Sequence, residues 1–347
     1  MKGPSSWRRR FEMVYPSTIM AQQKALVYAG LAALSLTLLL AGARPALAQA
    51  PRAAAPASGL ETIKVRDNVY AIFGAGSNIT VHVGEDGLIL VDSGSSAMAE
   101  QVVAAVKAIS NQPIRLIINT SADMDHVGGN EVVGAAGLEV NPDSFNDDPR
   151  ATVLSHENVL TRLSGDDKIP TDLWPSETFT SRVRSMYLNN EAVMTYRMTG
   201  AHTDGDVAVL FRKADVIATG DIIDLRSFPV IDAARGGSLQ GELDALNRLL
   251  EMTVPAMPLV LKPGRTLIIP GHGRVSDYAE LVEYRDMVTT IKDNVEALMK
   301  KGMTLDQVKA ANPTAGYRAR WGKESGPWTT DMFVEAIYNG LKNPGKS

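Results

Sequence analysis

The 347-residue sequence contains no cysteine. Disulfide bonds are therefore excluded, and the folded chain must be stabilised by its core alone. The same absence excludes a thiolate nucleophile and every metal site that needs a Cys ligand. The hydrophobic content of 45% is normal for a soluble protein with a substantial core, and the length suffices for one large domain or two ordinary ones. The composition is compatible with a globular enzyme.

The sequence also lacks an excess of basic residues. Its 35 Lys and Arg face 39 Asp and Glu, which gives a net charge of −4 at pH 7. Residues 1–48 hold six of the basic residues and one Glu, so the chain without them has 29 basic and 38 acidic residues and a net charge of −9. A basic surface that binds phosphate backbones is not expected. Nucleic acid is therefore not a predicted partner.

The apolar run near the N-terminus is too short to span a bilayer. It covers Ala25–Ala41, 17 residues that include Gly30, whereas a spanning helix needs about 20. Basic residues precede the run, and Ala46-Leu47-Ala48 places small residues where a signal peptidase cuts. Residues 1–48 are predicted to be a signal peptide that is removed. The mature protein is then expected in the periplasm or outside the cell, without a stable membrane span.

Two questions about this segment stay open. A membrane anchor is the alternative interpretation of the apolar run. Arg8-Arg9-Arg10 resembles a twin-arginine signal, but it lies 14 residues upstream of the run, and Met20 is a second candidate start. The sequence therefore does not fix the export route.

The remaining chain alternates strand and helix patterns. Residues 49–58 are rich in Ala and Pro and predict a flexible lead-in. Apolar patterning after it predicts a helix over 98–109 and strands at 63–65, 69–73, 79–83, 88–91 and 114–118. The order then repeats, with a helix over 243–250 and strands at 193–198, 207–211, 216–218 and 266–269. Two β-rich halves with outer helices predict a four-layer αββα sandwich over residues 59–276.

Residues 277–347 predict a helical C-terminal extension. Apolar residues keep a 3,4 spacing from Leu281 to Leu298, through about five turns. Thr304 with Gln307 predicts a capping box, and a last amphipathic helix is expected over 329–341. These helices are expected to pack on the sandwich or on a second copy of the chain, which makes a homo-oligomer a candidate assembly. No chemistry is assigned to them.

Candidate metal ligands gather in short loops at the ends of predicted strands. Three of the five histidines, His126, His202 and His272, lie in loops that contain Gly or Asp, and Asp221 follows Thr219-Gly220 at another strand end. Such loops often position functional groups in α/β folds, and imidazole with carboxylate is a ligand set for Zn²⁺ or Fe²⁺. Each histidine alone is an ordinary loop or capping residue. Four such sites in order predict a metal centre.

The order, spacing and sequences of these loops resemble the metallo-β-lactamase superfamily, over about Gly59–Ser276. In that family a Thr-His-x-His-x-Asp-His loop, a later His, an Asp after Thr-Gly and a Gly-His-Gly supply two metal positions. Residues 119–130 match the first loop, except that Ser121 and Asp123 stand where its first two histidines are expected. The resemblance implies a divalent metal and a small-molecule substrate.

The resemblance assigns the second metal position to four residues that are all present, Asp125, His126, Asp221 and His272. The first position keeps His202 and the shared Asp221, while Asp123 offers a carboxylate and Ser121 only a hydroxyl. Replacing imidazole by oxygen favours Mn²⁺, Mg²⁺ or Fe²⁺ over Zn²⁺ at that position. We expect one firmly bound ion, assigned as zinc. The second site is expected to be weak, absent or occupied by manganese or iron.

The activity that the resemblance implies is metal-assisted hydrolysis of an ester, lactone, lactam or related bond. Asp125 is expected both to bind the metal and to orient the attacking water. The absence of Cys excludes a β-lactamase with a thiolate ligand, and Asp221 resembles the bridging carboxylate of glyoxalase-type members. A non-catalytic ligand-binding member with a degenerate metal site is the main alternative. A flavodiiron-type oxidoreductase is disfavoured because no flavin-binding domain follows.

Other residues have weaker signals. His82 lies in an alternating strand and predicts a packed or surface histidine, and His156 predicts a helix cap. By the resemblance, Asp92 is expected to fix the neighbouring ligand loop through backbone hydrogen bonds, and Gly236-Gly237-Ser238 to shape the rim. Segment Asn141–Pro175 is expected to be a loop over the site or an exposed insertion. Five aromatic residues fit either the core or a substrate cleft: Trp174, Tyr187, Phe228, Trp321 and Trp328.

Overall fold

The computed structural model describes residues 59–140, 149–256 and 264–343, all of which lie in one compact unit, Ala55–Ser347. The predicted signal peptide, 1–48, and the lead-in, 49–58, lie outside the described residues. Among the helices of the described ranges, none combines the length and the apolar character that crossing a bilayer requires.

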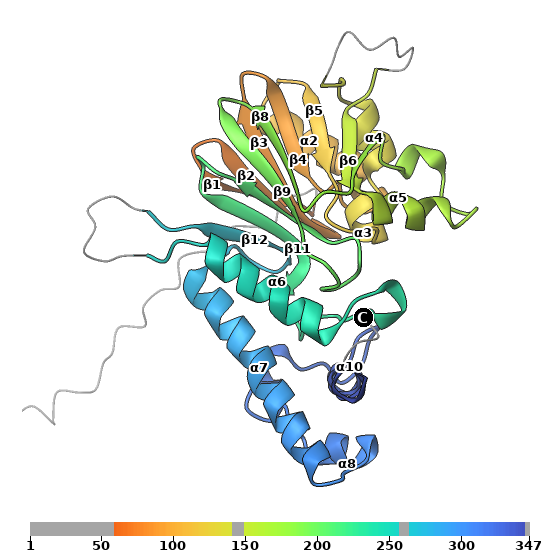
Figure 1. Cartoon of the computed structure of the whole chain (residues 1–347). Coiled ribbons are helices and arrows are strands. Elements are labelled where there is room, and N and C mark those ends of the chain that lie inside the picture. Colours follow the sequence, from red (N-terminus) through yellow and green to blue (C-terminus); the bar gives the residue numbers. More distant parts are fainter. Residues whose placement is uncertain (1–58, 141–148, 257–263, 344–347) are drawn as a thin grey trace, which may run out of the picture. The chain divides into compact units, whose positions relative to one another are not determined.

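The first half of the unit forms a seven-stranded sheet in sequence order (Figure 1). Its strands are β1 (Glu61–Arg66), β2 (Val69–Ala75), β3 (Ser77–Gly84), β4 (Gly87–Val91), β5 (Ile114–Ile118), β6 (Thr152–His156) and β7 (Glu177–Phe179). The pairs from β1 to β4 are antiparallel, and those from β4 to β7 are parallel. Helices α2 (Ala99–Ile109) and α4 (Asn130–Ala135) bury Val102, Val106 and Val133 against its outer face.

The second half forms a six-stranded sheet in the order β13-β12-β11-β10-β9-β8. Its strands are β8 (Val183–Leu188), β9 (Glu191–Arg197), β10 (Val207–Phe211), β11 (Val216–Asp224), β12 (Leu267–His272) and β13 (Ser276–Asp277). A buried cluster joins the inner faces of the two sheets, with Leu116 and Ile118 from one and Val209 and Phe211 from the other. Burial of this apolar surface holds the sheets together.

Helices α6 (Leu239–Met252) and α7 (Tyr278–Lys300) cover the outer face of the second sheet, and α10 (Thr330–Lys342) packs on these two helices (Figure 1). The predicted 3,4 stripe is the buried face of α7, because Tyr284, Val288 and Ile291 are fully buried in one cluster with Phe333 of α10. The capping box of Thr304 begins α8 (Leu305–Ala310), and α9 (Arg318–Trp321) follows. The C-terminal helices thus pack on the sandwich, and the four-layer αββα prediction is confirmed.

Two sequence-based expectations about the elements are wrong. Segment Asn141–Pro175 is not one long loop, because it contains β6 and then α5 (Glu157–Ser164); residues 141–148 lie outside the described residues. Strand β11 does not end before Asp221 but continues through it, with a shift in register near Gly220. The apolar runs of β6 and of the exposed edge strand β8 are too short to show a strand period in the sequence.

Candidate metal centre

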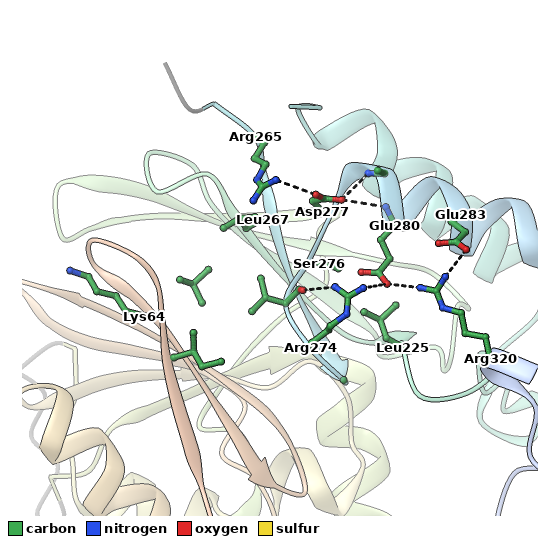
Figure 2. Close-up of a pocket in the computed structure, with 15 residues that line it drawn as sticks. Lys64, Leu225, Arg265, Leu267, Arg274, Ser276, Asp277, Glu280, Glu283 and Arg320 are labelled. Atoms are coloured by element: carbon green, nitrogen blue, oxygen red, sulfur yellow. Dashed lines mark hydrogen bonds and ion pairs between the residues drawn. The ribbon is translucent and has the colours of Figure 1, made fainter. Parts of the chain in front are cut away.

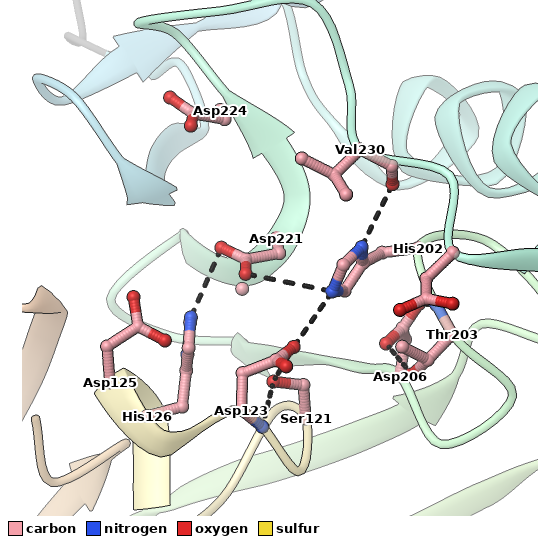
Figure 3. Close-up of polar contacts among 12 residues, drawn as sticks. Ser121, Asp123, Asp125, His126, His202, Thr203, Asp206, Asp221, Asp224 and Val230 are labelled. Atoms are coloured by element: carbon pink, nitrogen blue, oxygen red, sulfur yellow. Dashed lines mark hydrogen bonds and ion pairs between the residues drawn. The ribbon is translucent and has the colours of Figure 1, made fainter. Parts of the chain in front are cut away.

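The structure brings the six predicted ligands together. Figure 3 shows five of them, all except His272. Asp123, Asp125 and His126 follow β5 in the short helix α3 (Met124–Val127) and at its N-cap. His202 lies between β9 and β10, Asp221 lies within β11, and His272 ends β12. Their ligand atoms form two groups, each with all atoms within 4.8 Å of one another: Asp125, His126 and His272; and Asp123, His202 and Asp221.

Asp221 also belongs to the first group by distance. Its Oδ1 atom lies 3.1 Å from His126 Nε2 and 3.2 Å from His272 Nε2. His272 Nε2 lies 3.2 Å from Asp125 Oδ2. Among the described residues, His126 Nε2 and Asp221 Oδ1 are buried atoms with no hydrogen-bond partner. Buried polar atoms without a partner are costly, so converging lone pairs of this kind fit a bound cation.

Asp92 fixes the ligand loop through a backbone hydrogen bond, as expected, and it also orients one of the ligands. Its Oδ2 accepts a 2.8 Å hydrogen bond from His126 Nδ1, which leaves Nε2 free to face Asp221. Its Oδ1 accepts the backbone N–H of Thr120 at 2.8 Å, at the start of the ligand loop. A carboxylate behind a metal-binding imidazole fixes both its tautomer and its ring orientation.

The carboxylates change the proton affinity of the imidazoles. Burial alone would lower the pKa of His272, but hydrogen bonds with Asp125 and Asp221 raise that pKa to about 9. Burial alone would likewise raise the pKa of Asp221, yet the charges and hydrogen bonds of the histidines, His126 first, hold it well below its usual range. The cluster thus favours positive charge, and a metal ion must compete with protons for the same nitrogen atoms.

The second group, Asp123, His202 and Asp221, corresponds to the first metal position of the family pattern. It differs from the other group because the guanidinium of Arg235 lies against it. His202 Nε2 is 2.8 Å from Asp123 Oδ2 and 3.9 Å from Asp221 Oδ2, and His202 Nδ1 is 2.9 Å from the Val230 carbonyl. Arg235 Nη1 donates to Asp123 Oδ1, and its Nε donates to Asp232 at 2.6 Å. The pKa of Asp123 is held well below its usual range by His202 and Arg235, against the opposing effect of burial.

The hydroxyl of Ser121 is already hydrogen-bonded, so it does not add a free metal ligand to the second group. Its hydroxyl accepts the backbone N–H of Asp123 at 3.2 Å and lies 3.3 Å from Asp123 Oδ2. Arg235 is not among the site residues predicted from the sequence. Its signal is weak, since Asp232 and Arg235 form an ordinary i,i+3 pair in a short turn.

A cleft of about 440 Å³ borders Asp221 and His272. Lys323 and Trp328, from the segment between α9 and α10, also line this cleft, as does Arg226. The C-terminal extension therefore contributes to the site, contrary to the expectation that it has no chemical role. The other aromatic candidates do not line this cleft: Phe228 and Trp321 are core residues, Trp174 packs beside α5, and Tyr187 is exposed.

A larger cavity of about 1070 Å³ lies beyond the His272 loop, next to Gly273 (Figure 2). Within the described part of the chain, its lining includes none of the six candidate ligands. Its charged groups form pairs with one another: Arg274 and Arg320 each contact Glu280, at 2.7 and 2.6 Å, and Arg265 contacts Asp277 at 3.5 Å. The smaller cleft is therefore the one associated with the candidate ligands.

The two remaining histidines have structural roles. His82 is buried in β3, where Nε2 lies 2.6 Å from Glu191 and the ring stacks on Phe211. His156 is the N-cap of α5 and accepts the backbone N–H of Asn158 at 3.1 Å, which confirms the predicted cap.

Comparisons with known proteins agree with this arrangement. Residues 73–137 match the model of the metallo-beta-lactamase superfamily. A metallo-beta-lactamase from Pontibacter korlensis superposes with a TM-score of 0.52 and 19% identity, over 66% of this chain and 99% of that chain. A stereoselective inverting sec-alkylsulfatase from Pseudomonas sp. superposes with a TM-score of 0.57 and 15% identity, over 81% of this chain and 50% of that chain.

The present chain thus spans about half the length of that alkylsulfatase. No curated protein sequence matches the chain significantly. At these identities the two solved structures support the fold rather than an activity. The sequence match covers strands β3, β4 and β5, helix α2 and the loop that holds Asp123, Asp125 and His126. The chain is thus similar to the metallo-β-lactamase superfamily in the sequence of residues 73–137 and in its fold.

Proposed function

We propose that the protein is an exported, metal-dependent hydrolase that cleaves an ester, lactone, lactam or related bond in a small substrate. The observation that carries this proposal is the convergence of His126 Nε2 and His272 Nε2 on one buried oxygen of Asp221, at 3.1 and 3.2 Å. Two imidazoles and carboxylates are a ligand set that suits zinc. Export is supported by the signal-peptide pattern of residues 1–48.

Asp125, His126, Asp221 and His272 would hold the ion. When bound, it would supply a water of lowered pKa and polarise a carbonyl or phosphoryl oxygen. The side chain of Asp125 is 38% exposed, compared with 15% for Asp221, so Asp125 is the carboxylate that is more accessible to water. We assign Asp125 to orient this water and accept its proton, in addition to binding the ion.

The cleft favours a small substrate with an anionic group. Arg226 is neutralised by Asp224, with both guanidinium contacts at 3.1 Å. Lys323 forms no ion pair with any described residue and lines the same cleft as Asp221 and His272. Trp328 adds apolar surface beside it. The cleft thus combines one available cation with an aromatic wall.

A panel of chromogenic esters, lactones and cephalosporins tests the proposal, with Zn²⁺, Mn²⁺ or Fe²⁺ added to the purified protein. A secondary alkyl sulfate belongs in the panel because an alkylsulfatase shares the fold. We expect hydrolysis of at least one class, lost on chelation and in His272→Ala. The main alternative is a non-catalytic ligand-binding protein. A uniformly flat panel, with a folded and metal-loaded protein, would support that alternative.

A further inference from the structure

We propose that the guanidinium of Arg235 takes the place of the ion at the first metal position, so that the centre holds a single metal beside a built-in organic cation. The inference rests on the proposed function for the second position, formed by Asp125, His126, Asp221 and His272. It concerns the group Asp123, His202 and Asp221, where three candidate ligand atoms lie within 4.8 Å of one another.

Arg235 contacts two of these three ligands directly. Its Nη1 donates to Asp123 Oδ1, and its Nη2 lies 3.5 Å from His202 Nε2. The other oxygen of Asp123 is 2.8 Å from His202 Nε2. Both carboxylate oxygens of Asp123 and the ligand nitrogen of His202 therefore already have partners. By contrast, His126 Nε2 and Asp221 Oδ1 in the neighbouring position lie 3.1 Å from each other, and neither makes a hydrogen bond of acceptable geometry among the described residues.

A guanidinium supplies positive charge but no lone pair. It is a planar cation with five N–H donors, it stays protonated in proteins, and it cannot act as a metal ligand. A divalent ion at this position would have to break the contacts of Arg235 and then lie beside its charge. Repulsion between the two cations opposes this, whereas the neighbouring position lacks such a competing group.

The backbone holds Arg235 in this position. Arg235 ends the 3-10 turn Ala233–Arg235, whose N-cap Asp232 accepts from the Arg235 backbone N–H at 3.0 Å. The Asp232 N–H donates to the His202 carbonyl at 3.0 Å, and the Asp204 N–H donates to the Arg235 carbonyl at 3.0 Å. The arginine loop and the His202 loop are thus joined on both sides of the ligand.

Gly237 makes this close contact possible. A Cβ atom at this position would lie 2.1 Å from the His202 carbonyl oxygen and 2.9 Å from the Asp232 backbone nitrogen. Neither backbone atom can move aside as the end of a flexible side chain can. The loop therefore approaches His202 at a distance that only glycine permits, and this approach places Arg235 against Asp123.

The metal content of Arg235→Ala and Arg235→Gln tests the inference. Each variant and the unaltered protein are saturated with Zn²⁺ or Mn²⁺ and freed of excess ion, and the bound metal is measured by mass spectrometry. We expect one ion per chain in the unaltered protein and about two in the variants. Arg226→Ala is the matched control: this arginine lines the cleft but contacts Asp224 instead of Asp123, so its variant should keep one ion.

Adding Asp123→Ala to Arg235→Ala should remove the second ion, which would assign that ion to the first position. Two ions in the unaltered protein would overturn the inference and leave the proposed function intact. One ion in both Arg235 variants, with thermal unfolding that shows them to be folded, would also overturn it. No ion in any form would reject the proposed metal site itself. Arg235→Gln removes the charge but keeps a polar side chain that can donate hydrogen bonds, so the test does not depend on the folding of Arg235→Ala.

Discussion

Asp92 and His126 form a buried pair in which Nδ1 of the imidazole donates to the carboxylate at 2.8 Å. Asp92 itself has a left-handed backbone conformation, with φ at 65°. Aspartate and asparagine tolerate this conformation better than most residues, so Asp92→Asn changes the charge without adding backbone strain. The pair therefore offers a clean test of how the residue behind a ligand affects metal binding.

We expect Asp92→Asn to weaken metal binding by about 10- to 100-fold, because the imidazole loses the carboxylate that sets its tautomer and orientation. Competition with a chromogenic chelator measures the change. Asp244→Asn, on the exposed side of α6, is the control and should bind metal normally. Unchanged affinity in Asp92→Asn would mean that packing alone orients His126.

The six ligands are not expected to be equivalent. Asp125→Ala or His272→Ala should abolish hydrolysis and binding of the ion at the second metal position, because each residue contributes to the group that includes Asp221 Oδ1. Asp123→Ala should retain that ion, since its carboxylate pairs with His202 and Arg235. Equilibrium dialysis with Zn²⁺ gives the ranking. The reverse order would make Asp123 a principal ligand.

Restoring the histidines that the family pattern contains tests the first position in another way. From the sequence, Ser121→His with Asp123→His is expected to raise zinc occupancy toward two. Arg235 modifies this expectation, because its charge would remain beside the new imidazoles. We expect two zinc ions per chain only when Arg235→Ala is added, measured by metal analysis. Full occupancy in the double variant would show that the guanidinium does not compete with zinc.

Glu242 gives a prediction about stability. This residue is fully buried in α6, and neither carboxylate oxygen has a hydrogen-bond partner among the described residues. Burial raises its pKa well above the usual value, with further contributions from the charges of Asp206 and Asp221. The pKa of Glu242 is thus higher in the folded chain than in the unfolded chain. Its contribution to stability is complete below the ordinary glutamate pKa and is lost as the pH rises toward the pKa in the folded chain.

Glu242→Gln removes this titration. We expect the variant to have a higher Tm at pH 8 and a flatter dependence of Tm on pH. Between the pKa values of Glu242 in the unfolded and folded chains, its advantage in free energy of unfolding should grow by up to about 1.4 kcal/mol per pH unit. Thermal unfolding from pH 4.5 to 8 provides the measurement. Glu251→Gln, at an exposed position of the same helix, should change stability little. Parallel curves for Glu242→Gln and the unaltered protein would contradict the prediction.

Lys323 gives a prediction about the substrate. Lys323→Ala should raise KM for an anionic substrate roughly 2- to 5-fold, with little effect on kcat, since an exposed charge contributes about 0.2–1 kcal/mol to binding. A neutral analogue with the same leaving group should not respond. Lys301→Ala, on an exposed residue after α7, is the control. An equal loss for the neutral analogue would mean that Lys323 supports the cleft wall rather than binding charge.

The sequence could predict most of the fold and the candidate ligands for physical reasons. His126, His202 and His272 belong to a rare residue type and follow apolar strands, so both the strand and the ligand can be recognised locally. The stripe from Leu281 to Leu298 is long enough to define a helix period. Strand β8 is not, because an exposed edge strand needs little apolar alternation.

The role of Arg235 could not be predicted in this way. Its contact with Asp123 joins residues 112 positions apart, and nothing in the turn Asp232 to Gly236 distinguishes it from a surface turn. The same holds for Lys323 and Trp328, which approach His272 only through the packing of α7 and α10. Long-range packing determines these positions, and the local periodicity of the sequence does not predict such packing.

The position of Lys323 and Trp328 in the chain also bears on the order in which the site is assembled. During synthesis from the N-terminus, every candidate ligand has left the ribosome once His272 has emerged, whereas the opposite wall of the cleft follows later. A chain that ends before Lys323 therefore contains all six candidate ligands but lacks two of the residues that line the cleft. Exchange of the segment around Lys323 and Trp328 would therefore alter the lining of the cleft and leave the set of candidate ligands unchanged.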